Sequence, residues 1–105
     1  MNYLIEQQLI QAIETRKMVS FIYIEKDARR DIRMAAPHAL FISTAGHKNI
    51  DAFQYDGYSK QGNLPDWRQF TIDNIRDIDI LDESFEIAHG YNQNSSKYQR
   101  VICKV

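Results

Sequence analysis

The first amphipathic pattern in the chain covers residues 3–16. Its apolar positions follow the i, i+4, i+7, i+8 spacing of one helical face, and they are Ile5, Leu9, Ala12 and Ile13. Gln and Glu fill most positions between them, and Arg16 and Lys17 come last, which suits the helix dipole. The pattern predicts one helix over residues 3–16 that packs against another part of the protein.

Residues 18–25 change to β-branched and aromatic side chains, which is typical of a strand with little exposed on either face. A polar stretch over residues 25–31 then turns the chain, and residues 32–36 resume an extended pattern. The two segments predict a hairpin whose second strand is interrupted by Pro37.

Two further short apolar runs, residues 40–43 and 50–55, are separated by a polar loop over residues 44–48 and predict a second hairpin. Residues 56–66 follow and contain the densest group of turn-forming residues in the chain, including two glycines and a proline. We expect a surface loop there, a place where function is often carried.

The last third of the chain predicts two strands and an additional strand at the C-terminus. Residues 67–71 form a short strand, and residues 73–77 one helical or 3₁₀ turn. Residues 76–81 alternate apolar and acidic side chains, as a half-buried strand does. Residues 90–96 are a polar linker, and the alternation over residues 97–105 predicts the final strand.

One helix followed by about five to seven short strands predicts a mainly β fold. We expect either a small β-barrel over residues 18–82 or a strongly bent antiparallel sheet, with the helix packed over one opening. A chain of 105 residues leaves no room for a second core, so residues 1–105 are predicted to form a single domain.

Composition and charge limit the partners and the cellular location that we expect for the protein. The formal net charge of -1 removes the strongest argument for general nucleic-acid binding, which rests on a basic domain, although a local basic patch stays compatible. The single cysteine, Cys103, cannot form an internal disulfide and is expected to be a small buried hydrophobic residue. With no leader pattern and no apolar run of about 18 residues, we expect a cytoplasmic protein without membrane contact.

Residues that carry most catalytic and metal chemistry are scattered along the chain. No two soft metal ligands have the short spacing of a zinc site; they are His38, His47, His89 and Cys103. Asp77 and Asp79 alternate onto a predicted solvent face, and no phosphate-binding glycine loop or nucleophile signature is present. We therefore expect no metal, no cofactor and no enzymatic activity; a small hydrolase stays a minor alternative.

Cationic, aromatic and hydroxyl side chains form the remaining candidate site. They are Arg29, Arg30 and Arg33 around the first hairpin, Tyr58 and Ser59 in the long loop, and Arg68 with Phe70 on one strand face. Guanidinium groups bind phosphate or carboxylate bidentately and rings stack on bases, so the set suits a nucleotide-type pocket. The competing interpretation is that these arginines only solubilise the surface and that Tyr23 and Trp67 belong to the core.

The order of these segments resembles the WYL domain of bacteria, in a short variant. The resemblance is carried by LIQAIETRKMVSFIY, DIRMAAPHAL, GYSKQGNLPDWRQFTIDNI and DIDILDESFE, and by a QxxGYS pattern followed by WRxF. The namesake tripeptide is absent, and Lys48, Asn49 and Ile50 take its place. The resemblance implies an Sm-like or SH3-like small barrel used in sensing or regulation, with ligand-binding positions at Tyr23, Arg33, Gln54, Tyr58, Ser59, Arg68 and Phe70.

We therefore predict a non-catalytic, ligand-sensing regulatory module that binds a small anionic ligand, such as a nucleotide or a short single-stranded oligonucleotide. The alternative is a protein–protein interaction or homo-oligomerisation module, in which an exposed strand edge pairs with a partner or another copy. The first hypothesis requires Arg33 and Arg68 to face one shared hollow, whereas the alternative does not.

Overall fold

The N-terminal helix, α1 (Tyr3–Thr15), opens the computed structural model, which describes residues 3–59 and 62–105. It ends one residue before the predicted boundary, and Arg16 turns the chain with a φ of 56°. Leu9, Ala12 and Ile13 on its predicted apolar face are buried, so the amphipathic helix is confirmed. No helix within the described residues has the length and apolar character needed to cross a membrane.

Within the described residues, six strands form one antiparallel sheet in the order β4-β3-β2-β1-β5, with β6 paired to β2. A 3₁₀ turn, η1, links β4 to β5, and a second one, η2, precedes β6. The bounds are β1 (Lys17–Ile24), β2 (Arg30–Ile42), β3 (Lys48–Gly57), β4 (Asp66–Thr71), η1 (Ile72–Asn74), β5 (Ile75–Ser84), η2 (Ser96–Tyr98) and β6 (Val101–Lys104).

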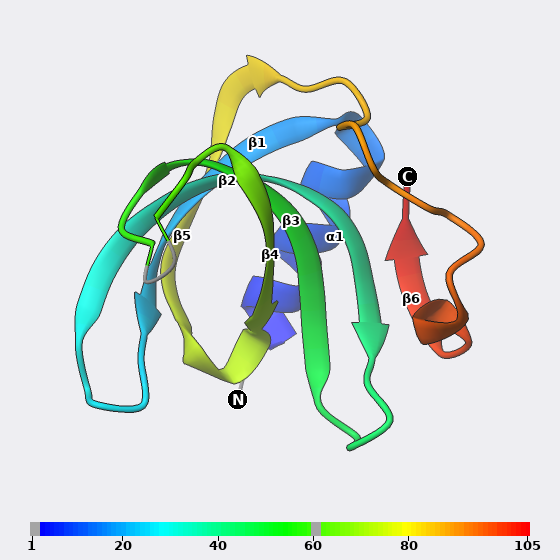
Figure 1. The fold of residues 1–105 in the computed structure, drawn as a ribbon, viewed down its shortest axis with the longest axis horizontal. Coiled ribbons are helices and arrows are strands. Elements are labelled where there is room, and N and C mark those ends of the chain that lie inside the picture. The colour runs from blue at the N-terminus through cyan, green and yellow to red at the C-terminus, as the bar shows by residue number, and fades with distance from the viewer. Residues whose placement is uncertain (1–2, 60–61) are drawn as a thin grey trace.

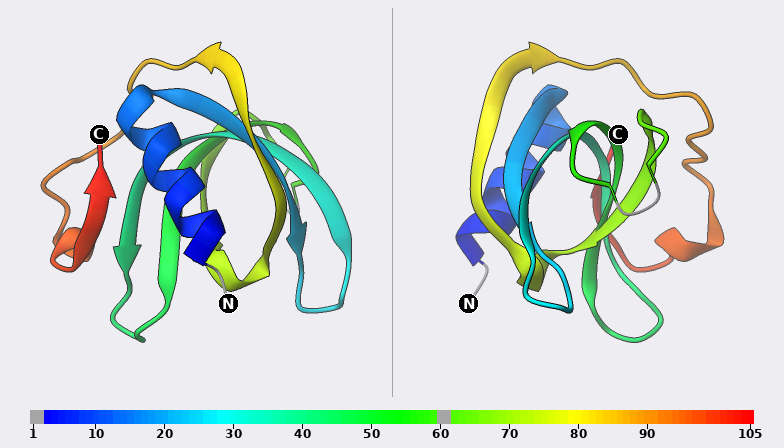
Figure 2. Two further views of the ribbon diagram at one scale, coloured as in Figure 1. Left: turned by 180° about the vertical axis from the view of Figure 1, so that it is seen from behind. Right: turned by 60° about the vertical axis from the view of Figure 1, so that its left-hand side comes forward.

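The sheet is bent and, within the described residues, is not closed by hydrogen bonds. β4 pairs with β3 and β5 pairs with β1, so these two strands form opposite edges although η1 joins them directly. Figures 1 and 2 show the sheet curving round, with α1 lying across it on the far side of Figure 1. The predicted mainly β class with one N-terminal helix is confirmed, as a bent sheet and not as the closed barrel considered for residues 18–82.

β2 is longer than predicted, because Pro37 does not interrupt it. The strand runs from Arg30 to Ile42 and joins two segments that were expected to be separate strands. β1 pairs with β2 only as far as Ala35, and β6 begins its pairing at Ala39, so Pro37 lies where neither strand needs its missing N–H. A register shift towards β3 between Pro37 and Ala39 takes up the irregularity.

The loop predicted over residues 56–66 is shorter at both ends, because β3 extends to Gly57 and β4 begins at Asp66. Residues 60 and 61 of that prediction lie outside the described residues. The start of the loop, residues 58 and 59, lies beside β2, since the Tyr58 N–H donates to the carbonyl of Ile32 at 3.2 Å. This contact brings the GYS segment next to the start of β2.

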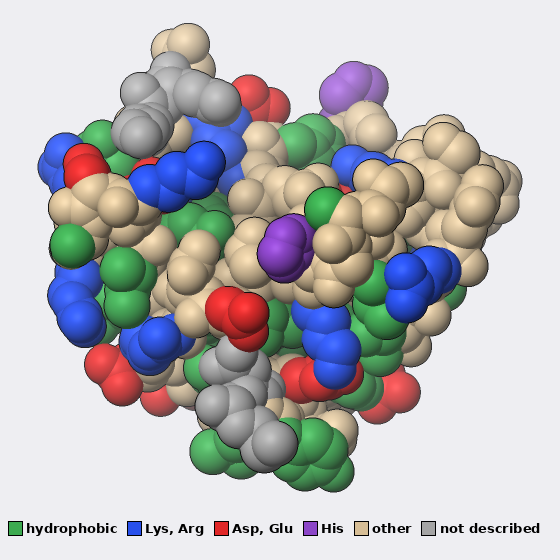
Figure 3. Space-filling model, turned by 90° about the horizontal axis from the view of Figure 1, so that it is seen from below, with side chains coloured by type: hydrophobic (Ala, Val, Ile, Leu, Met, Phe, Trp, Pro, Cys, Tyr) green, Lys and Arg blue, Asp and Glu red, His purple; other side chains and the backbone are tan. Residues whose placement is uncertain are grey.

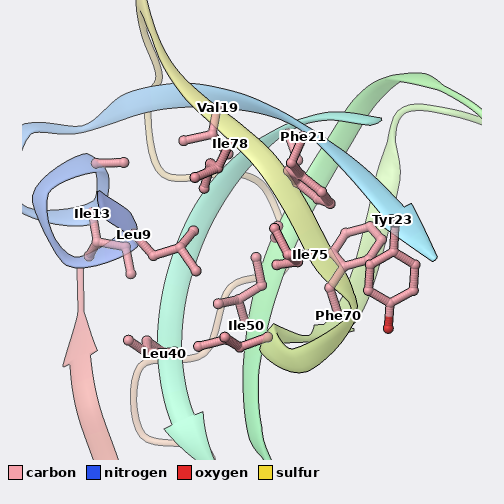
Figure 4. Packing of buried hydrophobic residues seen from close by; sticks show 14 residues of the cluster. Leu9, Ile13, Val19, Phe21, Tyr23, Leu40, Ile50, Phe70, Ile75 and Ile78 are labelled. Carbon is pink, nitrogen blue, oxygen red and sulfur yellow. The ribbon is translucent and has the colours of Figure 1, made fainter. Parts of the chain in front are cut away.

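The main core lies between α1 and the inner face of the bent sheet. Figure 4 shows Leu9 and Ile13 of α1 near Leu40 and Val19, while the rings of Phe21, Tyr23 and Phe70 fill the other end. Phe70 packs edge-on against Phe21 and Tyr23, with ring centroids 5.0 and 4.9 Å apart. Each such side chain contributes about 1.5–3 kcal/mol by burial, and the aromatic end of this core forms a rigid base for neighbouring groups.

In the C-terminal tail, residues 85–105, the part before β6 packs on the opposite face of β2, β3 and β4, whereas β6 pairs with β2 and places Cys103 against the main core. Side chains alternate along β3, so Ile50 and Ala52 enter the core while Asp51 accepts a hydrogen bond from Tyr98 of the tail at 2.6 Å. The final strand, β6, covers Val101–Lys104 and is shorter than the predicted residues 97–105, because η2 occupies Ser96–Tyr98. The part of the tail before β6 therefore covers the outer side of the sheet next to edge strand β4.

Candidate functional site

A small hollow of about 200 Å³ opens at the aromatic end of the core, and we call it the arginine pocket. Four separate parts of the chain build it: the end of β1, the start of β2, the residues after β3, and β4. It is lined by Tyr23, Glu25, Arg33, Ser59, Arg68, Gln69 and Phe70. Figure 3 shows Lys and Arg side chains gathered around the β1–β2 hairpin on this part of the surface, with Asp and Glu between them.

Arg33 is buried in the pocket wall, with only 4% of the residue exposed. Its guanidinium carbon lies 5.3 Å from the ring centre of Tyr23, 5.2 Å from that of Tyr58 and 5.6 Å from that of Phe70. The nearest carboxylate oxygen is that of Glu25, 3.7 Å from Nη2, which is an ion-pair distance but not a hydrogen bond. Nε and Nη2 of this buried cation have no hydrogen-bond partner among the described residues.

Arg68 enters the pocket from β4 and is held by several oxygen atoms. Its Nε and Nη2 donate to the Ser59 hydroxyl at 3.2 and 2.8 Å, Nη2 also donates to the Gly62 carbonyl at 2.8 Å, and Nη1 donates to the Trp67 carbonyl at 2.7 Å. Asp66 lies 3.3 Å from Nη1. The N–H of Trp67, and secondarily Arg68, lowers the pKa of the Asp66 carboxyl, so this carboxylate is ionised at neutral pH.

Tyr58 contacts two guanidinium groups. Its ring centre lies 3.7 Å from the guanidinium carbon of Arg29 and 5.2 Å from that of Arg33, both within the range of cation–π attraction. Arg29 is in turn paired with Asp31 at 2.7 Å. These contacts connect the β1–β2 hairpin to the segment that follows β3.

The structure brings most of the predicted ligand-binding residues together. Arg33 and Arg68 line the same hollow, as the binding hypothesis requires, and so do Tyr23, Ser59 and Phe70; Tyr58 packs on Arg33. Gln54 does not line the pocket: it is fully buried, and its Nε2 donates to the carbonyls of Asp56 and Tyr58 at 3.1 and 2.8 Å. Its contacts support the GYS segment, while the ligand-binding role of the whole set stays a prediction.

The interpretation of the arginines as surface residues and of Tyr23 as a core residue holds only in part. Arg33 is buried and therefore not a solubilising surface residue, whereas Arg29 and Arg30 are exposed. Tyr23 belongs to both the core and the pocket wall, and its hydroxyl accepts the N–H of Thr71 at 3.0 Å. Sequence reasoning missed Glu25 and Gln69, which line the pocket; the alternation that placed Arg68 and Phe70 together gives no signal for either.

A second and larger hollow, about 430 Å³, lies between β4 and the C-terminal tail. Asp51 is buried there and binds the Tyr98 hydroxyl at 2.6 Å and the Lys97 ammonium at 2.7 Å. Burial and then the hydrogen bond to Asp51 raise the pKa of Tyr98, so its hydroxyl stays protonated. Asp51 and Lys97 are already paired with each other there, and Arg68, which lines this hollow as well, is held by Ser59 and Asp66. Nε and Nη2 of Arg33, in contrast, have no hydrogen-bond partner among the described residues.

Comparison with known proteins supports the fold. A scan against protein-family models and a search of curated proteins find no match. A solved structure with a similar fold is proteasome accessory factor B/C (PafBC) of Arthrobacter aurescens, with a TM-score of 0.67 and 18% sequence identity. The match covers 84% of this chain and 13% of the PafBC chain. This likeness supports the resemblance to the WYL domain at the level of the fold alone.

Proposed function

We propose that this chain is a non-catalytic regulatory module that binds a small anionic ligand, a nucleotide or a short single-stranded oligonucleotide, in the arginine pocket. The observation that carries the proposal is Arg33, a residue that is 4% exposed and whose Nε and Nη2 have no hydrogen-bond partner among the described residues. Leaving a buried charged donor unpaired is costly, and an anion entering the pocket would remove that cost. The fold shared with part of PafBC agrees with a sensing or regulatory role.

The chemistry of the pocket favours binding over catalysis. The Ser59 hydroxyl is the candidate nucleophile in the pocket. Its oxygen already accepts two N–H groups from Arg68, and it donates to the Gly62 carbonyl at 3.4 Å. Within the described residues, no carboxylate or imidazole is hydrogen-bonded to it, as a general base would be. The rings of Tyr23 and Phe70 line the pocket instead, and they are the apolar groups that a base or sugar would contact there.

Calorimetric titration tests the proposal, with nucleoside 5′-monophosphates and short DNA and RNA strands as ligands. We expect saturable binding that weakens as salt rises, because ion pairing is screened. Arg68→Ala should weaken binding at least about tenfold through lost charge-assisted hydrogen bonds, and Arg68→Lys should restore only part of it.

Arg30→Ala is the matched control, since Arg30 is exposed and does not line the pocket but its loss changes the net charge equally. Equal losses for Arg68→Ala and Arg30→Ala would indicate general surface attraction and contradict a pocket. Absence of binding by every ligand would also contradict the proposal.

A second candidate function is self-association through β6. This strand is four residues long, pairs with β2, and presents Val101 and Ile102 with 37% and 36% of their surface exposed. An accessible edge with apolar side chains can pair with the same strand of another copy. Sedimentation should then show a concentration-dependent dimer that Ile102→Lys abolishes and Ile87→Lys, at an exposed tail position outside the strands, preserves. A monomer at all concentrations would exclude this function.

A further inference from the structure

We propose that the arginine pocket selects a phosphomonoester, a doubly charged terminal phosphate, over singly charged anions, and that Glu25 limits the affinity for either by competing for Arg33. The inference rests on the proposed function, because it concerns the ligand of the same pocket. It assigns to Glu25, a residue of the β1–β2 turn, the role of an internal competitor that the ligand's anionic group must displace.

The turn fixes the backbone of Glu25 in front of Arg33. The Glu25 N–H donates to the Arg29 carbonyl at 2.8 Å, and the Ala28 N–H donates to the Glu25 carbonyl at 2.9 Å. The Glu25 side chain is 16% exposed, lines the pocket and reaches to 3.7 Å from Nη2 of Arg33. At that distance the carboxylate balances the guanidinium charge but forms no hydrogen bond with the N–H groups of Arg33. An anion that does form these hydrogen bonds can therefore replace the carboxylate.

Each arginine at this site already has a carboxylate partner. Arg29 pairs with Asp31 at 2.7 Å, Arg68 with Asp66 at 3.3 Å and Arg33 with Glu25 at 3.7 Å. The two longest pairs are those of the pocket guanidinium groups, so these are the pairs that an incoming anion can replace. Because two guanidinium groups line the pocket, an anion with two charges can pair with both of them, whereas an anion with a single charge balances only one.

The size of the pocket points to a chain end or a mononucleotide. A hollow of about 200 Å³ admits one phosphoryl group with part of its sugar or base, and not several nucleotides of a strand. A terminal phosphate carries about -1.5 to -2 charges at pH 7, whereas a phosphodiester inside a strand carries one. Charge and volume therefore both favour the terminal group.

The test compares each of the four ribonucleoside 5′-monophosphates with its methyl phosphodiester, which has the same base and sugar but a single negative charge. In calorimetric titrations at pH 7.5 and low salt, we expect the unmodified protein to bind the monophosphate at least about tenfold more tightly than the ester. Glu25→Gln should tighten binding of both ligands about tenfold, and of the monophosphate at least as much as of the ester, because the competing negative charge is gone.

Glu83→Gln is the control, since Glu83 is an exposed carboxylate of β5 that does not line the pocket. If Glu25→Gln fails to fold, as judged by circular dichroism, Glu25→Asp withdraws the carboxylate by one methylene group and should also tighten binding of both ligands.

Equal binding of monophosphate and ester by the unmodified protein would overturn the inference and leave the proposed function standing. So would a Glu25→Gln variant that behaves like Glu83→Gln. If neither ligand binds the unmodified protein or the Glu25 variants, and short strands do not bind either, the proposed function fails as well.

Discussion

Gly57 lies at the point where β3 passes closest to β2. Its φ is 98°, and a Cβ atom built there would overlap the carbonyl oxygen of Ile32 and come within 2.9 Å of the Cα atom of Arg33. Arg33 is the register partner of Gly57, so the absence of a side chain at one residue allows the backbone of the other to lie beside the pocket.

Replacing Gly57 by alanine should therefore do more than strain one residue. We expect Gly57→Ala to lower the free energy of unfolding by at least about 2 kcal/mol, since backbone overlap adds to the unfavourable φ. Gly46→Ala, at φ 86° with open space around it, isolates the conformational cost and should lose about 1 kcal/mol. Urea unfolding followed by circular dichroism measures both, and equal losses would contradict the close approach.

Individual side chains differ in how well the sequence predicts them. Arg68 and Phe70 fall on one face because strand alternation places them there, and the structure agrees. The same rule puts Gln54 on the inner side of β3 but cannot tell that its amide binds the backbone of Asp56 and Tyr58 instead of facing a ligand. Glu25 was not predictable, because its approach to Arg33 depends on how the turn closes.

At the scale of elements, His38 joins β2 to the C-terminal tail. Its Nε2 accepts the N–H of Ala88 at 3.0 Å, so the proton of the neutral ring is on Nδ1, which donates to the Ala36 carbonyl at 2.8 Å. Burial is the main cause that lowers the pKa of His38; the charge of Arg16 acts in the same direction, while the Ala36 hydrogen bond and Asp51 oppose it. Protonation would put a donor where Ala88 already donates.

This arrangement predicts a stability that falls in mild acid. Because the folded pKa lies below the ordinary 6.5, the unfolded chain binds the proton more readily. The contribution is complete above pH 6.5 and is lost as pH falls from 6.5 towards the lowered value, by at most about 1.4 kcal/mol per pH unit. Urea unfolding at pH 7.5 and 5.5 should show this slope in the unmodified protein and a smaller slope in His38→Gln.

His47→Gln is the control for that measurement, since His47 is exposed in the β2–β3 loop. It should keep the pH dependence of the unmodified protein. An unchanged slope in His38→Gln would mean that other groups cause the loss in acid.

Helices and strands were predicted correctly where the local sequence pattern determines them. The predictions were wrong where contacts with a neighbouring strand determine the bounds. Residues 3–15 form a helix because their own periodicity specifies an apolar face. Pro37 does not end β2, because the pairing of β2 with β1 stops at Ala35 and its pairing with β6 starts at Ala39, and no local pattern contains that information. η2 shortens the final strand for a similar reason: Tyr98 bonds to Asp51 of β3 instead of continuing the alternation.

For the whole molecule, the mainly β class with one N-terminal helix was predicted from the sequence, but the strand order of the sheet and its closure were not. β4 and β5 are consecutive, yet they form opposite edges of the sheet because η1 redirects the chain between them. The pocket draws on residues as far apart as Tyr23 and Phe70, so its membership came from a family resemblance and its geometry only from the folded chain. Such long-range contacts cannot be read from spacing alone.

Trp67 is the only tryptophan of the chain, and its surroundings make it a natural optical reporter. Its indole N–H donates to the His89 carbonyl at 2.8 Å, its ring lies 4.8 Å from that of His38, and its own carbonyl accepts from Arg68 at 2.7 Å. Emission from this single indole should therefore respond to movement of the tail, to the protonation of His38 and to occupation of the arginine pocket, without any label.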